Sequence, residues 1–187
     1  MNYPTGVKKS LTNNKIKIDY KNRGMNLEDD INNTNNYYID KKIAYIYKKP
    51  TPIKLVKVDY KKGRIDEAYF EKPSTTDYNG IYKGKYIDFE AKETINKSGF
   101  PLVNIHKHQI KHIRNIVKEN GICFLIVRFT NNNETYLLMA KDFLFFIDSN
   151  KKSTIPIDYF KEVGYLIKEK FIPRVDYLEI IDNMEDL

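Results

Sequence analysis

The sequence predicts an α/β domain with a mixed central sheet that is flanked by helices and carries a protruding β-hairpin. Apolar residues recur at helical spacing in some segments and at strand spacing in others, in the order helix, strands, helix, strands, helices. The length of 187 residues suits one domain with a real core. A hydrophobic fraction of 41% with 13% aromatic residues indicates folding, because disordered chains are poor in aromatic residues.

The N-terminal part divides at about residue 22. Residues 1–22 are polar and lack apolar periodicity, so we expect a flexible arm ahead of one domain over residues 23–187. After Gly24, apolar positions recur at helical spacing, and acidic residues lie early in the segment, as the helix dipole favours. The positions that define this first helix are Leu27, Ile31, Thr34 and Tyr38.

Three strands are expected after the first helix. Segments 43–47 and 53–60 are rich in β-branched and aromatic residues and are separated by a stiff, proline-bearing link. A third strand, at about 65–70, follows a cationic turn. The last two strands therefore form a hairpin, over about residues 53–70, whose tip carries Lys61, Lys62 and Arg64.

The second half of the chain predicts a central helix and further strands. The helix lies between Leu102 and Val117, with Gly121 as its C-cap. The nearly continuous apolar run at 121–129 predicts a strand buried on both faces, with a strand at 135–139 beside it. Short helical segments are expected at 143–147, 159–163 and 177–181.

The segment 73–94 carries the candidate site. A two-residue turn at Lys83-Gly84 places four polar side chains on one face of a hairpin, because side chains alternate along each strand. They form two facing pairs, Asp77 with Glu90 and Thr75 with Lys92. The opposite face collects side chains suited to a core, namely Tyr78, Tyr82, Ile87, Phe89 and Ala91.

A competing turn at Asn79-Gly80 would change this register. It is the stronger dipeptide signal, and it would set Asp77 against Tyr82 and separate the polar side chains. We favour the turn at Lys83-Gly84 because it explains the polar and apolar alternation of both strands at once.

The facing carboxylates of Asp77 and Glu90 predict a divalent-metal site. Directly paired residues have β-carbons roughly 4.5–5.5 Å apart, close enough for two carboxylates to hold one cation. Oxygen ligands without a convergent cysteine and histidine set favour Mg²⁺, with Mn²⁺ as a substitute, over zinc. Lys92 adds an ammonium that can stabilise charge on a reacting phosphate, so phosphodiester hydrolysis is predicted. The alternative is an exposed ladder of surface salt bridges.

The central helix adds further polar candidates. Gln109 lies on its apolar stripe and should point inward, toward a metal, a metal-bound water or a buried backbone group. His108 and His112 are four residues apart, as in helical zinc sites, but the glutamate of an HExxH arrangement is missing. Exposed side chains near phosphate are therefore the favoured interpretation for these two histidines and for His106.

Charge and hydropathy limit the partners and the cellular location that the protein can have. A net charge of +7 and a pI near 9.2 suggest a nucleic-acid partner, although a compositional bias toward lysine is an alternative. No apolar run approaches the roughly 18 residues needed to span a bilayer, and the N-terminus lacks a signal-peptide pattern, so we expect a cytoplasmic protein without membrane contact. Cys123 lies in an apolar run and should be buried rather than disulfide-bonded or nucleophilic.

Along nearly its whole length the chain resembles the RecU family of Holliday junction resolvases. A strand carrying Glu-x-Lys paired to an earlier Asp is also typical of restriction-endonuclease-like nucleases. The segments that resemble the family are Met1-Asn2-Tyr3-Pro4, Arg23-Gly24-Met25, Leu27-Glu28, Lys48-Lys49-Pro50-Thr51-Pro52, Ala68-Tyr69-Phe70, Pro73 to Gly80, Tyr86 to Thr94, Phe100-Pro101-Leu102, Asn104-Ile105-His106, His108-Gln109 and Pro173-Arg174.

The resemblance implies a homodimer with a restriction-endonuclease-like core that nicks four-way DNA junctions symmetrically during recombination and repair. It implies Lys92 as the transition-state stabiliser and Mg²⁺ held by Thr75, Asp77, Glu90 and Gln109. The hairpin would be a stalk that enters the junction, and Arg23 would contribute to DNA binding. A recombinase and a branch-migration helicase are further expected partners.

Two departures from the family concern junction binding. The stretch between Val58 and Ala68 is a few residues shorter than usual, and the arm departs after Gly6. A non-catalytic junction-binding or recombinase-regulating protein is the alternative to an enzyme. The intact Asp77, Glu90 and Lys92 favour the enzyme, because a pure binder does not need them.

Overall fold

The computed structural model describes residues 26–70 and 75–184. The expected N-terminal arm and Arg23 lie outside these residues. The helices are α1 (Leu27–Asp40), η1 (Leu102–Asn104), α2 (Lys107–Lys118), α3 (Ala140–Ser149), α4 (Ile157–Val163) and α5 (Tyr177–Asp182). The strands are β1 (Tyr45–Lys48), β2 (Ile53–Asp59), β3 (Arg64–Phe70), β4 (Tyr78–Tyr82), β5 (Lys85–Thr94), β6 (Gly99–Pro101), β7 (Ile122–Phe129), β8 (Glu134–Met139), β9 (Thr154–Pro156) and β10 (Tyr165–Leu166).

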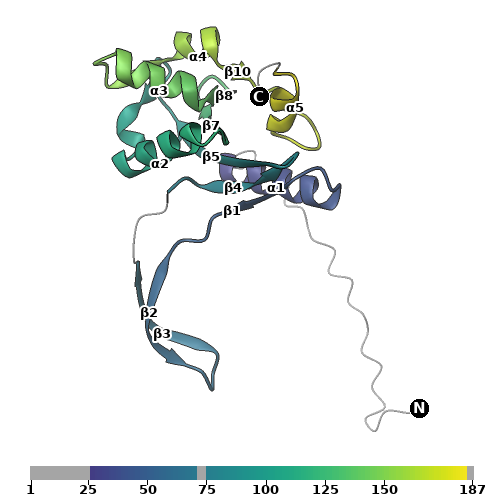
Figure 1. Cartoon of the computed structure of the whole chain (residues 1–187), viewed down its shortest axis with the longest axis vertical. Coiled ribbons are helices and arrows are strands. Elements are labelled where there is room, and N and C mark those ends of the chain that lie inside the picture. The colour runs from purple at the N-terminus through teal and green to yellow at the C-terminus, as the bar shows by residue number, and fades with distance from the viewer. Residues whose placement is uncertain (1–25, 71–74, 185–187) are drawn as a thin grey trace, which may run out of the picture.

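A mixed six-stranded sheet forms the centre of the molecule, in the order β1-β4-β5-β7-β8-β10 (Figure 1). Strands β5 and β7 run parallel, and the other neighbours run antiparallel. One core lies between the sheet and the helices α1 and α5, and the other lies between the sheet and α2, α3 and α4. The predicted α/β class with a mixed, helix-flanked sheet is therefore confirmed.

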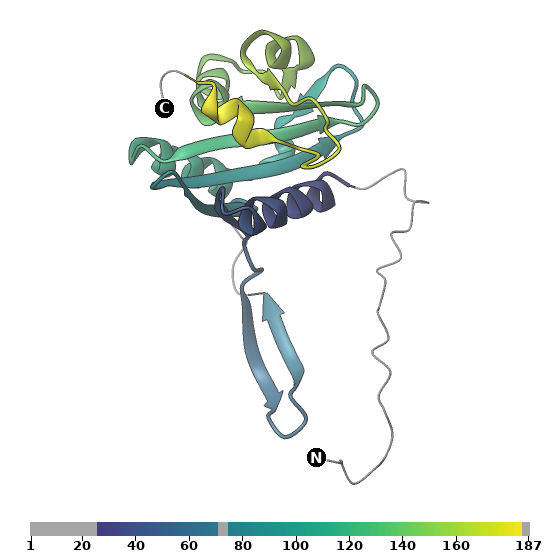
Figure 2. The ribbon, with the colours of Figure 1, turned by 90° about the vertical axis from the view of Figure 1, so that its right-hand side faces the viewer.

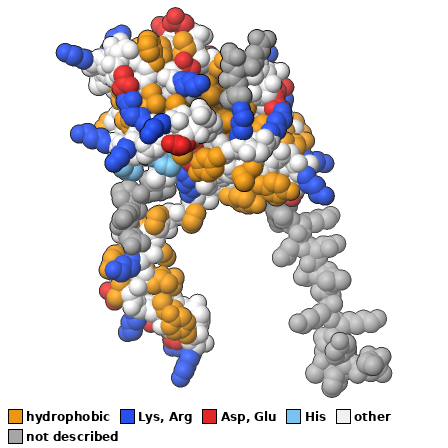
Figure 3. Space-filling model, viewed as in Figure 1, with side chains coloured by type: hydrophobic (Ala, Val, Ile, Leu, Met, Phe, Trp, Pro, Cys, Tyr) orange, Lys and Arg blue, Asp and Glu red, His pale blue; other side chains and the backbone are white. Residues whose placement is uncertain are grey.

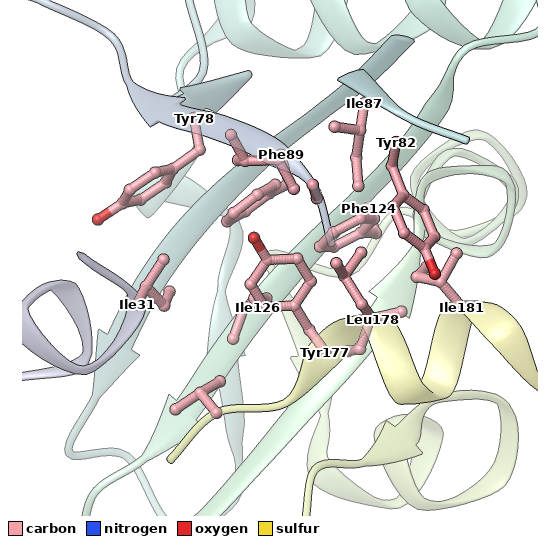
Figure 4. Close-up of a cluster of buried hydrophobic side chains, with 14 of the residues drawn as sticks. Ile31, Tyr78, Tyr82, Ile87, Phe89, Phe124, Ile126, Tyr177, Leu178 and Ile181 are labelled. Atoms are coloured by element: carbon pink, nitrogen blue, oxygen red, sulfur yellow. The ribbon is translucent and has the colours of Figure 1, made fainter. Parts of the chain in front are cut away.

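Strand β7 supplies both cores. All of its residues are buried, as the apolar run predicted, and successive side chains enter opposite cores because strand side chains alternate. In the first core Phe89 stacks between Tyr78 and Phe124, with ring centroids 4.8 and 4.7 Å away, and Tyr177 of α5 packs against it (Figure 4). The predicted apolar face of the β4–β5 hairpin is thus core.

Strands β2 and β3 form a separate two-stranded antiparallel sheet that projects away from the central sheet (Figures 1 and 2). Most of its side chains are exposed, and Figure 3 shows apolar side chains along it with Lys or Arg near its free end. At the tip, Lys62 lies 3.8 Å from Asp59 and Arg64 lies 2.8 Å from Asp66. Such exposed ion pairs contribute little stability, so the cations remain available to a partner.

Three details differ from the sequence-based expectations. The central helix α2 begins at Lys107 rather than near Leu102, because residues Leu102–Asn104 form the separate 3-10 helix η1. Asn120, not Gly121, takes the left-handed conformation after α2, with φ of 58°, because asparagine also tolerates this region. Gly121 follows it and donates its N–H to the Ile116 carbonyl. The short strands β6, β9 and β10 were not predicted, since two or three residues carry no detectable periodicity. Within the described part of the chain, none of the helices has the length and apolar character of a membrane span.

Candidate active site

The β4–β5 hairpin has the predicted register. Tyr82 faces Lys85 and Tyr78 faces Phe89, with Lys83 and Gly84 at positive φ in the turn. The competing turn at Asn79-Gly80 is excluded, because both residues lie inside β4. Glycine is required at position 80 because β1 approaches closely: a Cβ there would lie 2.1 Å from the Tyr45 carbonyl oxygen of β1.

This register brings Asp77, Glu90 and Lys92 together. Asp77 lies immediately before β4, and its Oδ2 accepts a hydrogen bond of 3.1 Å from the Ala91 N–H. The Lys92 Nζ lies 3.7 Å from the same Asp77 oxygen and forms an ion pair with Glu90 Oε1. The Glu90 side chain is fully buried, whereas those of Asp77 and Lys92 are partly exposed. The cluster is therefore not an exposed salt-bridge ladder.

Gln109 points inward from α2, as predicted, and meets Glu90. Its Nε2 donates a hydrogen bond of 2.7 Å to Glu90 Oε1, and its Oε1 accepts one of 2.9 Å from the His106 N–H. The amide thus contacts a backbone group, as one of the expected alternatives had it, and also the Glu90 carboxylate, which was not expected and is itself a candidate metal ligand. The two bonds fix the Gln109 amide and so fix one oxygen of Glu90.

The donor set fits a hard divalent cation. Among the described residues, the buried Glu90 Oε2 has no hydrogen-bond partner, and a buried carboxylate oxygen is costly to leave unpaired. Within residues 26–70 and 75–184, no three Asp, Glu, His or Cys side chains converge on one point. Mg²⁺ does not need such a cage, because it is usually held by one or two carboxylates together with waters and substrate phosphates.

Burial and the proximity of the two carboxylates dominate the electrostatics of the cluster. Burial and the neighbouring Asp77 raise the pKa of Glu90 to about 7, although Lys92 and Gln109 act in the opposite direction. Burial alone would lower the pKa of Lys92, but Glu90 and Asp77 outweigh it and raise that pKa. Lys92 is therefore an ammonium at neutral pH, and an additional cation beside Glu90 would favour its ionised form.

The raised pKa of Glu90 predicts a pH-dependent stability. Because the folded state binds this proton more tightly than the unfolded state, metal-free protein should lose stability as pH rises from about 4.5 through about 7. A shift of this size corresponds to roughly 3 kcal/mol. The melting temperature of metal-free protein should fall more steeply between pH 5 and 8 than that of Glu90→Gln. Added Mg²⁺ should reverse the loss only in the native chain; equal pH profiles would contradict the raised pKa.

Thr75 is placed less centrally than the other candidates. The paired part of β4 begins at Tyr78, so the expected pairing of Thr75 with Lys92 is not part of the ladder. Thr75 is exposed, and its Oγ1 accepts a hydrogen bond of 3.1 Å from Lys49 Nζ. Its hydroxyl therefore lies beside the segment that leads into the β2–β3 hairpin.

A buried polar cluster around Asp88 was not predicted. The Asp88 Oδ2 lies 2.6 Å from Lys49 Nζ, accepts a bond of 2.9 Å from the Tyr86 hydroxyl and lies 3.2 Å from His112 Nε2. Thr76 donates to its other oxygen. The interpretation of His112 as an exposed side chain is therefore wrong. Strand alternation could have identified Asp88, because it lies two residues before Glu90 on the same face.

A cavity of about 180 Å³ lies beside the cluster, at the N-terminal end of α1. Glu93 of β5 holds this end of the helix, since its Oε1 accepts a hydrogen bond of 2.9 Å from the Leu27 N–H. The cavity gives access to Asp77 and Lys92 from outside. The residues that line it are Asn26, Leu27, Glu28, Asp77, Tyr78, Ala91, Lys92 and Glu93.

Other predicted positions lie apart from this cluster. Lys61, Lys62 and Arg64 lie at the end of the hairpin that points away from the central sheet (Figure 2). Cys123 is buried in the second core, as expected, and burial raises the pKa of its thiol.

Comparisons with known proteins identify the family of the chain. The profile of the family described as recombination protein U (RecU) matches residues 22–183. The Holliday junction resolvase RecU of Oceanobacillus iheyensis is 52% identical, over 98% of this chain and 99% of that protein. The proteins of the same name from Streptococcus thermophilus and Pediococcus pentosaceus are 49% and 46% identical, over 98% of this chain and 97% and 96% of theirs. The chain therefore belongs to the RecU family.

Proposed function

We propose that this chain is a Holliday junction resolvase, a magnesium-dependent endodeoxyribonuclease that nicks four-way junctions symmetrically in homologous recombination and DNA repair. The observation that carries the proposal is the buried Glu90, with one unpartnered oxygen, beside Asp77 and Lys92. The relatives named Holliday junction resolvase RecU support the choice of substrate. Nicking of a synthetic four-way junction with and without Mg²⁺ tests the proposal.

The residues of the cluster have separate proposed roles. Asp77 and Glu90 would hold Mg²⁺, which Mn²⁺ could replace. When bound, the metal stabilises negative charge on the reacting phosphate and promotes attack by water. The Gln109 carbonyl oxygen and the Thr75 hydroxyl are further proposed ligands. The former already accepts one hydrogen bond, and a carbonyl oxygen has a second lone pair.

Lys92 would act on the DNA itself. Its ammonium lies between Asp77 and Glu90 and is partly exposed, so it can donate to a phosphate oxygen as negative charge develops there. Gln109 keeps Glu90 oriented, and the Ala91 N–H keeps Asp77 oriented. The β4–β5 hairpin carries Glu90 and Lys92, with Asp77 directly before it, and it contacts α2 through the hydrogen bond between Gln109 and Glu90. This arrangement supports a restriction-endonuclease-like core.

We also propose a homodimer. A four-way junction offers two equivalent strands, so a twofold dimer would place one site near each and make paired cuts. The edge strand β1 leaves Tyr45 and Tyr47 about half exposed, and Ile81 lies opposite Tyr45 on β4. An exposed apolar patch of this kind supports an interface with a second copy.

The β2–β3 hairpin is proposed to act as a stalk that selects branched DNA. The centre of a junction is lined by phosphates of several strands, so the cationic tip would meet more backbone there than on a linear duplex. Replacing Lys61, Lys62 and Arg64 together by serine should lower junction affinity at least tenfold, with little effect on duplex affinity. The salt dependence should flatten by up to roughly three units of slope, about one for each lost phosphate contact.

Binding is measured without metal over a range of salt concentrations. The control replaces three exposed lysines of α2, Lys107, Lys111 and Lys118, and so removes the same charge without changing the hairpin. Equal losses on junction and duplex from the tip variant would show general electrostatic attraction only. An unchanged junction affinity would show that the tip is a solvated turn that does not contact the DNA.

A further inference from the structure

Lys49 joins the root of the hairpin to the segment that carries Asp77. It follows β1 directly and is separated from β2 only by the proline-bearing link Pro50–Pro52. Its N–H donates a hydrogen bond of 2.8 Å to the Asp77 carbonyl oxygen. Its Nζ donates to the hydroxyls of Thr76 and Thr75, at 2.6 and 3.1 Å. One residue thus contacts three consecutive residues that lead into β4.

Asp88 holds the other side of the Lys49 ammonium. The two charges lie 2.6 Å apart, the Lys49 side chain is only 14% exposed and the Asp88 side chain is fully buried. The remaining contacts of Asp88, with Thr76, Tyr86 and His112, satisfy the carboxylate and fix its orientation. A buried, fully bonded ion pair has a defined geometry, unlike an exposed lysine that samples many rotamers.

This arrangement links the position of the hairpin to that of the site. Proline fixes φ, so Pro50 and Pro52 make the link to β2 stiff. A change in the direction of the hairpin should therefore move Lys49. Because Lys49 binds Thr75 and Thr76 through its side chain and Asp77 through its backbone, such movement should shift the oxygen ligands proposed for the metal.

We propose that Lys49 is a positioning residue that couples DNA binding by the hairpin to the placement of Thr75 and Asp77. The inference rests on the proposed junction-resolving function. Lys49 does not act on the reacting phosphate. Its ammonium holds the ligand segment in the geometry that the metal needs, and the hairpin root adjusts that geometry when DNA is bound.

The first test is Lys49→Met, which keeps the length of the side chain and removes the ammonium. Single-turnover nicking of saturating junction should fall at least tenfold, and the affinity of the DNA-free protein for Mn²⁺, measured by calorimetry, should fall at least threefold. Junction affinity in EDTA should stay within twofold of the native value. The control is Lys85→Met, at the first residue of β5. It removes the same charge and should change none of these quantities.

Restoring the ammonium provides a second test. Lys49→Cys alkylated with 2-bromoethylamine regains an amine at nearly the same distance, and should recover most of the lost nicking and Mn²⁺ affinity. The same variant alkylated with iodoacetamide should recover neither. Cys123 should not interfere, because it is buried in the second core.

A folding defect can be separated from a positioning defect. If Lys49→Met unfolds because Asp88 is left unpaired, Lys49→Met/Asp88→Asn removes both charges and should regain thermal stability while nicking stays at least tenfold low. Nicking and Mn²⁺ affinity within twofold of native in either folded variant would overturn the proposal. So would a loss of junction affinity with unchanged turnover, which would make Lys49 a phosphate contact. If the native chain cuts no junction, the proposed function fails, and the Mn²⁺ titration still decides the role of Lys49.

Discussion

Asp77→Ala and Glu90→Gln should each reduce nicking of a four-way junction about 1,000-fold or more, because either change removes a carboxylate proposed to hold the metal. Junction affinity in Ca²⁺ or EDTA should change less than about threefold, since neither substitution removes a cation from the DNA-binding surface. Single-turnover nicking and a binding titration, made on the same preparations, separate the two effects.

Glu119→Gln is the matched control for this prediction. Glu119 is an exposed acid at the C-terminal end of α2, the helix that also carries Gln109, so its loss changes the net charge equally without touching the cluster. It should leave nicking unchanged. Near-native nicking by Asp77→Ala or Glu90→Gln would show that these carboxylates are not the metal ligands.

Lys92→Met should lower the turnover of bound junction about 100- to 1,000-fold, the usual cost of losing one donor to a developing negative charge. Junction affinity should be nearly unchanged, because the interaction is made in the transition state. The substitution also removes the ion pair with the buried Glu90, so the metal-free protein should be less stable and Mg²⁺ should restore more of its stability.

Lys92→Arg separates charge from geometry. A guanidinium keeps the positive charge but presents its donors in a planar fork, so it should retain stability and recover turnover only in part. If Lys92→Met weakened junction binding while bound junction was cut at the native rate, Lys92 would be a phosphate anchor rather than a transition-state stabiliser.

The central part of the site could be predicted because two strands constrain each other. One register satisfies the alternation of β4 and of β5 together, and it brings Asp77 to Glu90. The dipeptide signal at Asn79-Gly80 was misleading for a tertiary reason, since Gly80 is required by the close approach of β1. Local turn preference is weaker than the packing of a third strand.

What could not be predicted depends on contacts between distant segments. Lys49 and Asp88 are separated by 39 positions, and nothing local to either indicates the partner. The partner of Gln109 stayed open for the same reason, because helical periodicity gives the inward direction but not the residue that α2 meets. Strands of two or three residues, such as β10, form only because a neighbouring edge is already in place.

The most direct test of the proposed function is nicking of an immobile synthetic four-way junction, labelled on each strand in turn. With Mg²⁺ the native chain should make two symmetrical nicks in opposing strands within the lifetime of one complex, leave a linear duplex of the same sequence uncut, and lose all cutting in EDTA. Mn²⁺ should replace Mg²⁺. Tight binding of the junction without any metal-dependent nick would contradict the account and identify a junction-binding protein instead.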